Sequence, residues 1–155
     1  FQNYSMNVLN FPKLKSIGNQ ALFSARVFKI AILNNLTTLC EHAFAYCCGL
    51  RYVEMNSLAL IKSQTFKRCI SLQRGKFHQV TQIEESAFFE CDNLDYLELP
   101  KIIQASTSQI QSQKIITFNP QIQFKQQQVA NKAIDPNYIF KTKFVQGCRL
   151  KIMRT

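Results

Sequence analysis

The chain has 155 residues, of which 46% are hydrophobic and 18% charged, so it has the size and composition of one folded domain and not of a disordered protein. Its longest apolar run, Ala43 to Leu50, has eight residues, well below the roughly 18 that a membrane-spanning helix requires. The formal net charge of +10 leaves anionic partners open.

A spacing of 22 residues relates four consecutive segments of the chain, 14–35, 36–57, 58–79 and 80–101. Eight columns of this alignment are apolar at 30 of their 32 positions, where composition alone would give about 15. Three columns show the repeat most clearly: Phe44, Phe66 and Phe88, then Cys47, Cys69 and Cys91, then Leu50, Leu72 and Leu94.

The repeat extends beyond both ends of these four segments. Met6, Leu9 and Phe11 fall in the columns of the strand apolar residues, so the chain opens in the second half of a repeat and we expect it to be part of a longer array. The segment from Ile102 keeps four of the eight apolar columns, which is the chance rate. The array therefore either ends there in a cap or continues with an altered spacing.

Each repeat is predicted to contain one strand and one short helical turn. The pattern Leu50-x-x-Val53-x-Met55 ends in the alternation of a strand with one buried face. The Phe-x-x-Cys spacing places both side chains on one face of a short helix or 3₁₀ turn. Such a unit cannot bury its own core, so we predict an α/β solenoid with one short parallel strand and a short helix or 3₁₀ turn per 22-residue repeat.

The columns resemble the BspA-like (bacterial surface antigen type) leucine-rich repeats, whose signature is an apolar pair followed by AFxxCxxLxxI. The resemblance covers residues 14–101 and is carried by Ala43-Phe44, Cys47, Leu50 and Val53, and again by Ala87-Phe88, Cys91, Leu94 and Leu97. It implies a curved solenoid used for adhesion or protein–protein recognition, with no shared catalytic residues. The asparagine ladder of the wider leucine-rich-repeat group is absent, because Leu58 and Ile102 occupy its positions.

The repeat 58–79 departs from the pattern at Thr65 and Gly75. Glycine in a strand allows close approach of another backbone, such as that of a ligand. It is also a weak point that stronger neighbouring repeats tolerate, and we favour this second interpretation.

The array is expected over residues 1–123, as a half repeat, four clear repeats (14–101) and one degenerate repeat. Residues 124–155 are expected to be a basic loop followed by a degenerate or truncated repeat. Residues 102–155 carry eight Lys or Arg against Asp135 alone, and this basic end could bind a nucleic acid or an acidic lipid. The lysines could equally keep a repeat edge soluble.

The cysteines are interpreted as free thiols, and we expect no metal, cofactor, small-molecule substrate or catalytic activity. Cys47, Cys69 and Cys91 share a column with Ala25, so a small apolar residue satisfies the position. No C-x-x-C motif is present, and the Cys-His candidates, Cys40, Cys48, His42 and His78, lack a pocket to orient them. Free thiols slightly favour the cytoplasm, whereas the resemblance leaves the cell surface open.

The strand residues outside the apolar columns form the predicted binding surface, on the concave face where repeat proteins generally bind. One column is Tyr52, Arg74 and Tyr96, and the next is Glu54, Lys76 and Glu98. Tyr and Arg are enriched in interface hot spots, but the charges could also pair across the sheet and only solubilise it. The residues predicted to bind a protein partner are Arg51, Tyr52, Glu54, Arg74, Lys76, Asp95, Tyr96 and Glu98.

Overall fold

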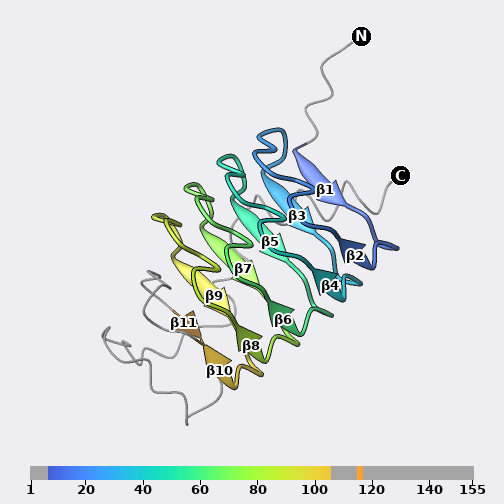
Figure 1. The fold of residues 1–155 in the computed structure, drawn as a ribbon, viewed down its shortest axis with the longest axis vertical. Coiled ribbons are helices and arrows are strands. Elements are labelled where there is room, and N and C mark those ends of the chain that lie inside the picture. Colours follow the sequence, from blue (N-terminus) through green and yellow to red (C-terminus); the bar gives the residue numbers. More distant parts are fainter. Residues whose placement is uncertain (1–6, 106–114, 117–155) are drawn as a thin grey trace, which may run out of the picture.

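The computed structural model describes residues 7–105 and 115–116, which form a solenoid of parallel strands with about four turns (Figure 1). A six-stranded parallel sheet has the order β1-β3-β5-β7-β9-β11. Its strands are β1 (Val8–Asn10), β3 (Ile30–Ile32), β5 (Tyr52–Glu54), β7 (Arg74–Lys76), β9 (Tyr96–Glu98) and β11 (Ile115–Ile116).

A second row of strands, which the sequence did not predict, lies beside the first (Figure 1). β2 (Ser16–Ile17) pairs with β4 (Thr38–Leu39), and a three-stranded sheet has the order β10-β8-β6. Its strands are β6 (Leu60–Ile61), β8 (Gln82–Ile83) and β10 (Gln104–Ala105). Each repeat therefore contributes two short strands, and the solenoid is built from β-strands and turns.

The predicted short helix of each repeat is not confirmed, because the described residues contain turns but no helix. In the turn between β4 and β5, alternate N–H groups have different acceptors. Those of Ala45 and Cys47 donate to carbonyls three residues back, whereas those of Phe44 and Tyr46 donate to the next repeat. Successive helical N–H groups would all donate within their own segment, so this division between repeats excludes a helix.

The same turns contain residues with positive φ at matching places in every repeat: Gln20 and Ser24, His42 and Tyr46, Gln64 and Arg68, Ser86 and Glu90. Their φ values lie between 55° and 62°, a region that non-glycine residues adopt at a cost. Four of them, Gln20, Ser24, Tyr46 and Arg68, donate their own N–H to a carbonyl of the next repeat, which stabilises this conformation.

The register of the six-stranded sheet follows the 22-residue repeat. Tyr52 pairs with Arg74, and Arg74 pairs with Tyr96. Ala31 pairs with Val53, so Ala31 is the buried central residue of the strand in the first repeat. β11 departs from this rule, because Leu97 pairs with Ile115, an offset of 18 residues. β10 still keeps the 22-residue offset, because Gln104 pairs with Gln82, so the parallel stacking continues beyond residue 101 and its spacing changes only at β11.

Stacked phenylalanine rings form the centre of the core. Phe44 and Phe66 lie 5.4 Å apart between ring centroids, and Phe66 and Phe88 lie 5.2 Å apart with nearly parallel rings. All three are buried. In the first repeat the corresponding residue is Leu22, and Phe28 packs edge-on against Phe44 at 6.1 Å instead. Each Phe contributes several kcal/mol, since Phe→Ala in a core costs about 3–5 kcal/mol.

The two irregular positions of the repeat 58–79 are both compensated. Thr65 is fully buried, and its hydroxyl donates to the carbonyl of Lys62 at 2.8 Å. A Cβ atom at Gly75 would lie 2.6 Å from Cε2 of Phe77 and 2.8 Å from Cδ2 of Leu97. The ring of Phe77 thus fills the space that a strand side chain occupies in neighbouring repeats, so an internal side chain, and not a ligand backbone, approaches Gly75.

This packing predicts that Gly75→Val lowers the free energy of unfolding by about 1–3 kcal/mol, because the valine collides with Phe77. Adding Phe77→Met recreates the Val53 and Met55 pair of the preceding repeat and should recover most of the loss. Urea denaturation followed by circular dichroism measures the coupling. Phe77→Met alone is the matched control and should destabilise by leaving a cavity. A double variant less stable than either single variant would contradict the compensation.

Candidate functional site

The outward side of the six-stranded sheet carries the predicted binding residues. The central residue of each three-residue strand of this sheet, β1, β3, β5, β7 and β9, is buried in the core, and the residues on either side of it lie on the outward side. Because the register joins residues 22 apart, Tyr52, Arg74 and Tyr96 lie in one column and Glu54, Lys76 and Glu98 in the next. We call these two columns the sheet face.

The first strands give this surface a different character. Val8, Ile30 and Ile32 occupy the corresponding outward positions of β1 and β3. Ile30 pairs with Tyr52 and belongs to the outward column, yet it is only 4% exposed. The outward surface is therefore apolar at Val8 of β1 and at both outward positions of β3, and polar at Asn10 and from β5 to β9.

Glu54 is held by a network of hydrogen bonds inside the protein. Its Oε2 accepts the hydroxyl of Tyr52 at 2.7 Å, and its Oε1 accepts the side-chain amides of Asn34 at 3.1 Å and Asn56 at 3.0 Å. Burial alone would raise the pKa of Glu54, but these bonds and the charge of Lys76 outweigh it and lower the pKa below 4.5. Glu54 thus stays ionised and is already committed to internal partners.

Glu98 on β9 has a role similar to that of Glu54 on β5, two strands away in the same sheet. Its Oε1 lies 3.0 Å from Nε2 of His78, and its Oε2 lies 3.7 Å from Nζ of Lys76. The hydroxyl of Tyr96 donates to Glu98 at 3.4 Å. Burial, together with the charge of Glu98, raises the pKa of Tyr96 to about 12. The predicted pairing of charges across the sheet is therefore present between Lys76 and Glu98.

Arg74 differs from these residues because it has no ion-pair partner among residues 7–105. It is half-buried at the start of β7, between Tyr52 on β5 and Tyr96 on β9. Arg51 and Asp95 are exposed immediately before β5 and β9. The eight predicted residues therefore lie together, but Glu54, Lys76 and Glu98 make internal bonds, whereas Arg51, Arg74 and Asp95 make no ion pair within the described part of the chain.

Sequence reasoning missed the polar column that supports this surface. Asn34, Asn56 and His78 each lie two residues after a strand. The two asparagines donate to Glu54, and His78 binds Glu98. Their common spacing of 22 residues is the signal that could have identified them. The expected ladder positions at Leu58 and Ile102 are buried apolar residues, two residues further along the chain.

Sequence reasoning also missed a row of rings and charges on the turns. Phe23 lies 5.1 Å from Tyr46 between ring centroids, and the guanidinium of Arg68 lies 5.6 Å from the centroid of Tyr46. Arg68 also forms an ion pair with Glu90. This turn row runs through four repeats, and its charged members already bind one another.

The column of cysteines forms hydrogen bonds from one repeat to the next. The thiols of Cys47, Cys69 and Cys91 donate to the carbonyls of Leu22, Phe44 and Phe66 at 3.0–3.1 Å. All three are buried. Burial raises the pKa of Cys47 to about 12, and that of Cys69 well above its ordinary value, with Cys91 adding to the effect. These thiols are structural hydrogen-bond donors and poor nucleophiles.

The cysteine and histidine side chains considered as a nucleophilic pair have other partners. His42 binds the side-chain oxygen of Gln64 at 3.1 Å, and His78 binds Glu98. The thiol of Cys48 faces the carbonyl of Arg68 at 3.7 Å. Cys40, Cys47, Cys48, Cys69 and Cys91 are free thiols, and Cys148 lies outside the described residues.

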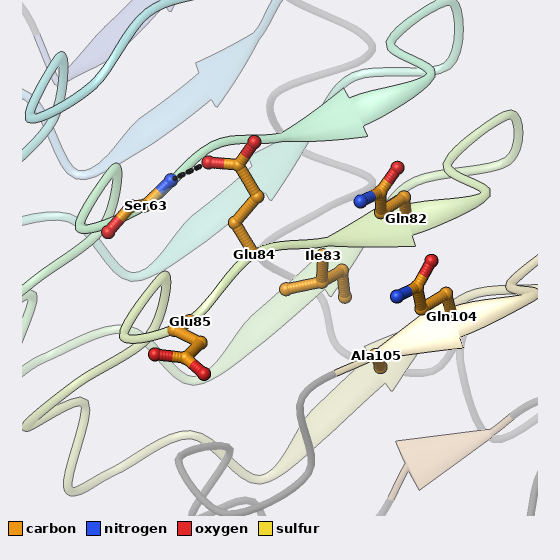
Figure 2. A pocket seen from close by; sticks show the side chains of 7 residues that line it. All are labelled: Ser63, Gln82, Ile83, Glu84, Glu85, Gln104 and Ala105. Carbon is orange, nitrogen blue, oxygen red and sulfur yellow. Dashed lines mark hydrogen bonds between the residues drawn. The ribbon is translucent and has the colours of Figure 1, made fainter.

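An open hollow of about 590 Å³ lies over the three-stranded sheet. Figure 2 shows Gln82 and Gln104 side by side on β8 and β10, with the carboxylate of Glu84 turned toward Ser63. That carboxylate accepts the backbone N–H of Ser63 at 2.8 Å. Among its described lining residues, the hollow contains no nucleophile hydrogen-bonded to a base, so its chemistry is that of a polar surface depression.

The part of the chain that the structure describes contains no group of three or more His, Cys, Asp or Glu side chains placed to hold a metal ion. It also has no helix with the length and apolarity that crossing a bilayer requires.

A family model matches most of the chain. The family model described as BspA type Leucine rich repeat region matches residues 1–128 with six copies. No curated protein matches the chain.

The thiol column predicts selective alkylation of the native protein. With iodoacetamide near pH 8.5, Cys40 and Cys48 should be modified, whereas Cys47, Cys69 and Cys91 should react only after unfolding, because burial excludes the reagent from all three and suppresses the thiolate of Cys47 and Cys69. Peptide mass spectrometry with fragment-ion localisation measures this. As the pH rises from 9 toward 12, the unfolded chain loses the Cys47 proton before the folded one, so the free energy of unfolding should fall. Equal labelling of all five thiols would contradict the prediction.

The Glu54 network predicts a stability difference that depends on pH. At pH 7, Glu54→Gln should lower the free energy of unfolding by about 1–3 kcal/mol, because a charged acceptor of three hydrogen bonds is lost. The pKa of Glu54 is depressed in the folded state, so the contribution is present above pH 4.5 and disappears as the pH falls through the folded pKa. Urea denaturation at several pH values measures the gap. Glu41→Gln, at an exposed glutamate, is the control, and a pH-independent Glu54→Gln gap would show that the carboxylate charge is irrelevant.

Proposed function

The chain belongs to the BspA-type leucine-rich-repeat family, and we propose that it is a recognition module that binds another protein through its sheet face. Leucine-rich repeats of this family generally mediate protein–protein interaction and are generally non-enzymatic. Family membership supports the kind of activity, and the geometry of the sheet face supports the location.

The observation that carries the proposal is the position of Arg74 between Tyr52 and Tyr96, with no ion pair to any residue that the structure describes. Arginine and tyrosine are the side chains most enriched in interface hot spots. An arginine flanked by rings can form bidentate hydrogen bonds with a partner carboxylate while its neighbours exclude water.

The surrounding network supports this assignment by fixing the tyrosines. The hydroxyls of Tyr52 and Tyr96 donate to Glu54 and Glu98 within the same strands, so both rings are held before a partner arrives. A preorganised surface loses less side-chain entropy on binding. In this proposal the glutamates are positioning residues, and Arg74 with the two rings makes the direct contacts.

The alternative prediction was an anion-binding module acting through the basic residues of segment 102–155. That segment lies almost wholly outside the described residues, and none of the observations above favours it. It stays an untested prediction.

The experiment is a crosslinked pull-down with the full chain, followed by affinity measurement on the purified partner. An Arg74→Ala and Tyr96→Ala double variant should weaken binding at least about 30-fold, because hot-spot truncations cost about 2 kcal/mol or more. The matched control is Tyr46→Ala with Arg68→Ala, which removes the same two residue types from the turn row. Circular dichroism verifies that both variants fold.

The two variants separate the possible binding surfaces. Loss of binding only in the Arg74 and Tyr96 variant supports the sheet face. Loss only in the Tyr46 and Arg68 variant would move the site to the turn row and overturn the proposal.

A further inference from the structure

Charge is segregated along the axis of the solenoid. Residues 7–76 contain ten Lys or Arg and two acids, a net charge of +8, whereas residues 77–105 contain six acids and Lys101, a net charge of −5. The sign changes within one repeat, between β7 and β9. A uniform solubilising surface would mix the two signs, so this segregation calls for a separate explanation.

The segregation is sharpest where the chain approaches the strands of the six-stranded sheet. We call this line of charges the strand-entry ridge: Arg26, Lys29, Arg51, Arg74, Asp92 and Asp95. Arg74 is half-buried, and the other five are exposed. Backbone hydrogen bonds fix their order, because Arg51 N donates to Lys29 O at 2.7 Å and Arg74 N donates to Arg51 O at 3.2 Å.

The ion pairs within the described residues do not include the charges of the strand-entry ridge. Elsewhere in the described residues, Arg68 pairs with Glu90 and Lys76 pairs with Glu98. None of the six ridge residues has an ion-pair partner there. Lys29 and Arg51 lie immediately before β3 and β5, two adjacent strands about 4.8 Å apart, so their like charges are neighbours, and no ion pair among the described residues offsets their repulsion.

We infer that the strand-entry ridge binds an acidic-then-basic segment of a partner protein that lies along the solenoid axis, a conclusion that rests on the proposed function. Carboxylates of the segment lie against Lys29, Arg51 and Arg74, and a cationic side chain lies against Asp92 or Asp95. The ridge crosses four strands, about 14 Å, which corresponds to about five residues of extended chain.

A polypeptide fits the ridge better than a nucleic acid. A phosphate backbone carries negative charge at every step, so it would meet Asp92 and Asp95 one strand beyond Arg74. A protein segment changes its charge from one residue to the next and can match the change of sign. Tyr52 and Tyr96 beside the ridge also provide the aromatic contacts that protein interfaces favour.

The test uses the full chain and two fluorescein-labelled peptides of equal composition, measured by fluorescence anisotropy. One peptide segregates its charges, Glu-Ser-Glu-Ser-Glu-Gly-Lys-Ser-Lys, and the other intersperses them. The segregated peptide should bind at least about fivefold more tightly, and its affinity should fall as salt rises from about 0.05 M to about 0.2 M. Equal affinity for the two peptides would overturn the inference.

Reversing the charge of two ridge residues tests whether the segregated peptide binds at the ridge. Lys29→Glu with Arg51→Glu should weaken binding of the segregated peptide about tenfold or more. Lys13→Glu with Lys15→Glu makes the same change in net charge at exposed positions before β2 and should change affinity less than about twofold. Equal losses in the two variants would show that only net charge matters and would overturn the inference.

A labelled single-stranded oligonucleotide gives the remaining comparison. Tighter binding of the oligonucleotide than of the segregated peptide, lost in the Lys29 and Arg51 variant, would assign the ridge to nucleic acid and overturn the inference. Neither variant alters Arg74 or Tyr96. A protein partner that still depends on those two residues therefore keeps the proposed function standing even if the ridge inference fails.

Discussion

The whole molecule depends on backbone hydrogen bonds that join each repeat to the residues 22 positions away. They set the register of β1 to β9, and in the turns they hold non-glycine residues at positive φ. With this register fixed, a residue and its counterpart in the next repeat must be neighbours. The phenylalanine stack, the thiol column and the paired strand residues are therefore consequences of one spacing, and a change in any column is felt by the repeats on both sides.

From repeat to repeat, the side chains of the core keep a similar total volume, although the residue type at a single position changes. Leu22 with Phe28 replaces the Phe44 and Leu50 pair of the next repeat, and the ring of Phe77 fills the space left by Gly75. Close packing explains this, because a void or an overlap costs stability wherever it lies. The repeat 58–79 appeared weak when each column was judged alone, but its irregular residues compensate for each other.

The sequence was sufficient to predict the family, the buried columns and the common face of Tyr52, Arg74 and Tyr96, because a strict period determines which side chains stack. It was insufficient for the second row of strands, since a two-residue strand such as β4 is too short to show alternation. The short helix or 3₁₀ turn inferred from the Phe44 and Cys47 spacing is not confirmed, since a turn whose alternate N–H groups donate to the next repeat places these two residues on one face equally well. The network under Glu54 escaped notice because it joins residues from two repeats.

The internal bonds also determine which part of the surface remains available to a partner. Glu54 and Glu98 hold the tyrosine rings and Lys76 in place, so these charges are largely neutralised before any partner binds. Lys29 and Arg51 make no ion pair with the residues that the structure describes, and adjacent like charges cost some stability. A partner that brings carboxylates to this line would remove that repulsion as well as form new ion pairs. Binding there would therefore stabilise the stack of repeats, through the same strand-to-strand spacing that brings the charges together.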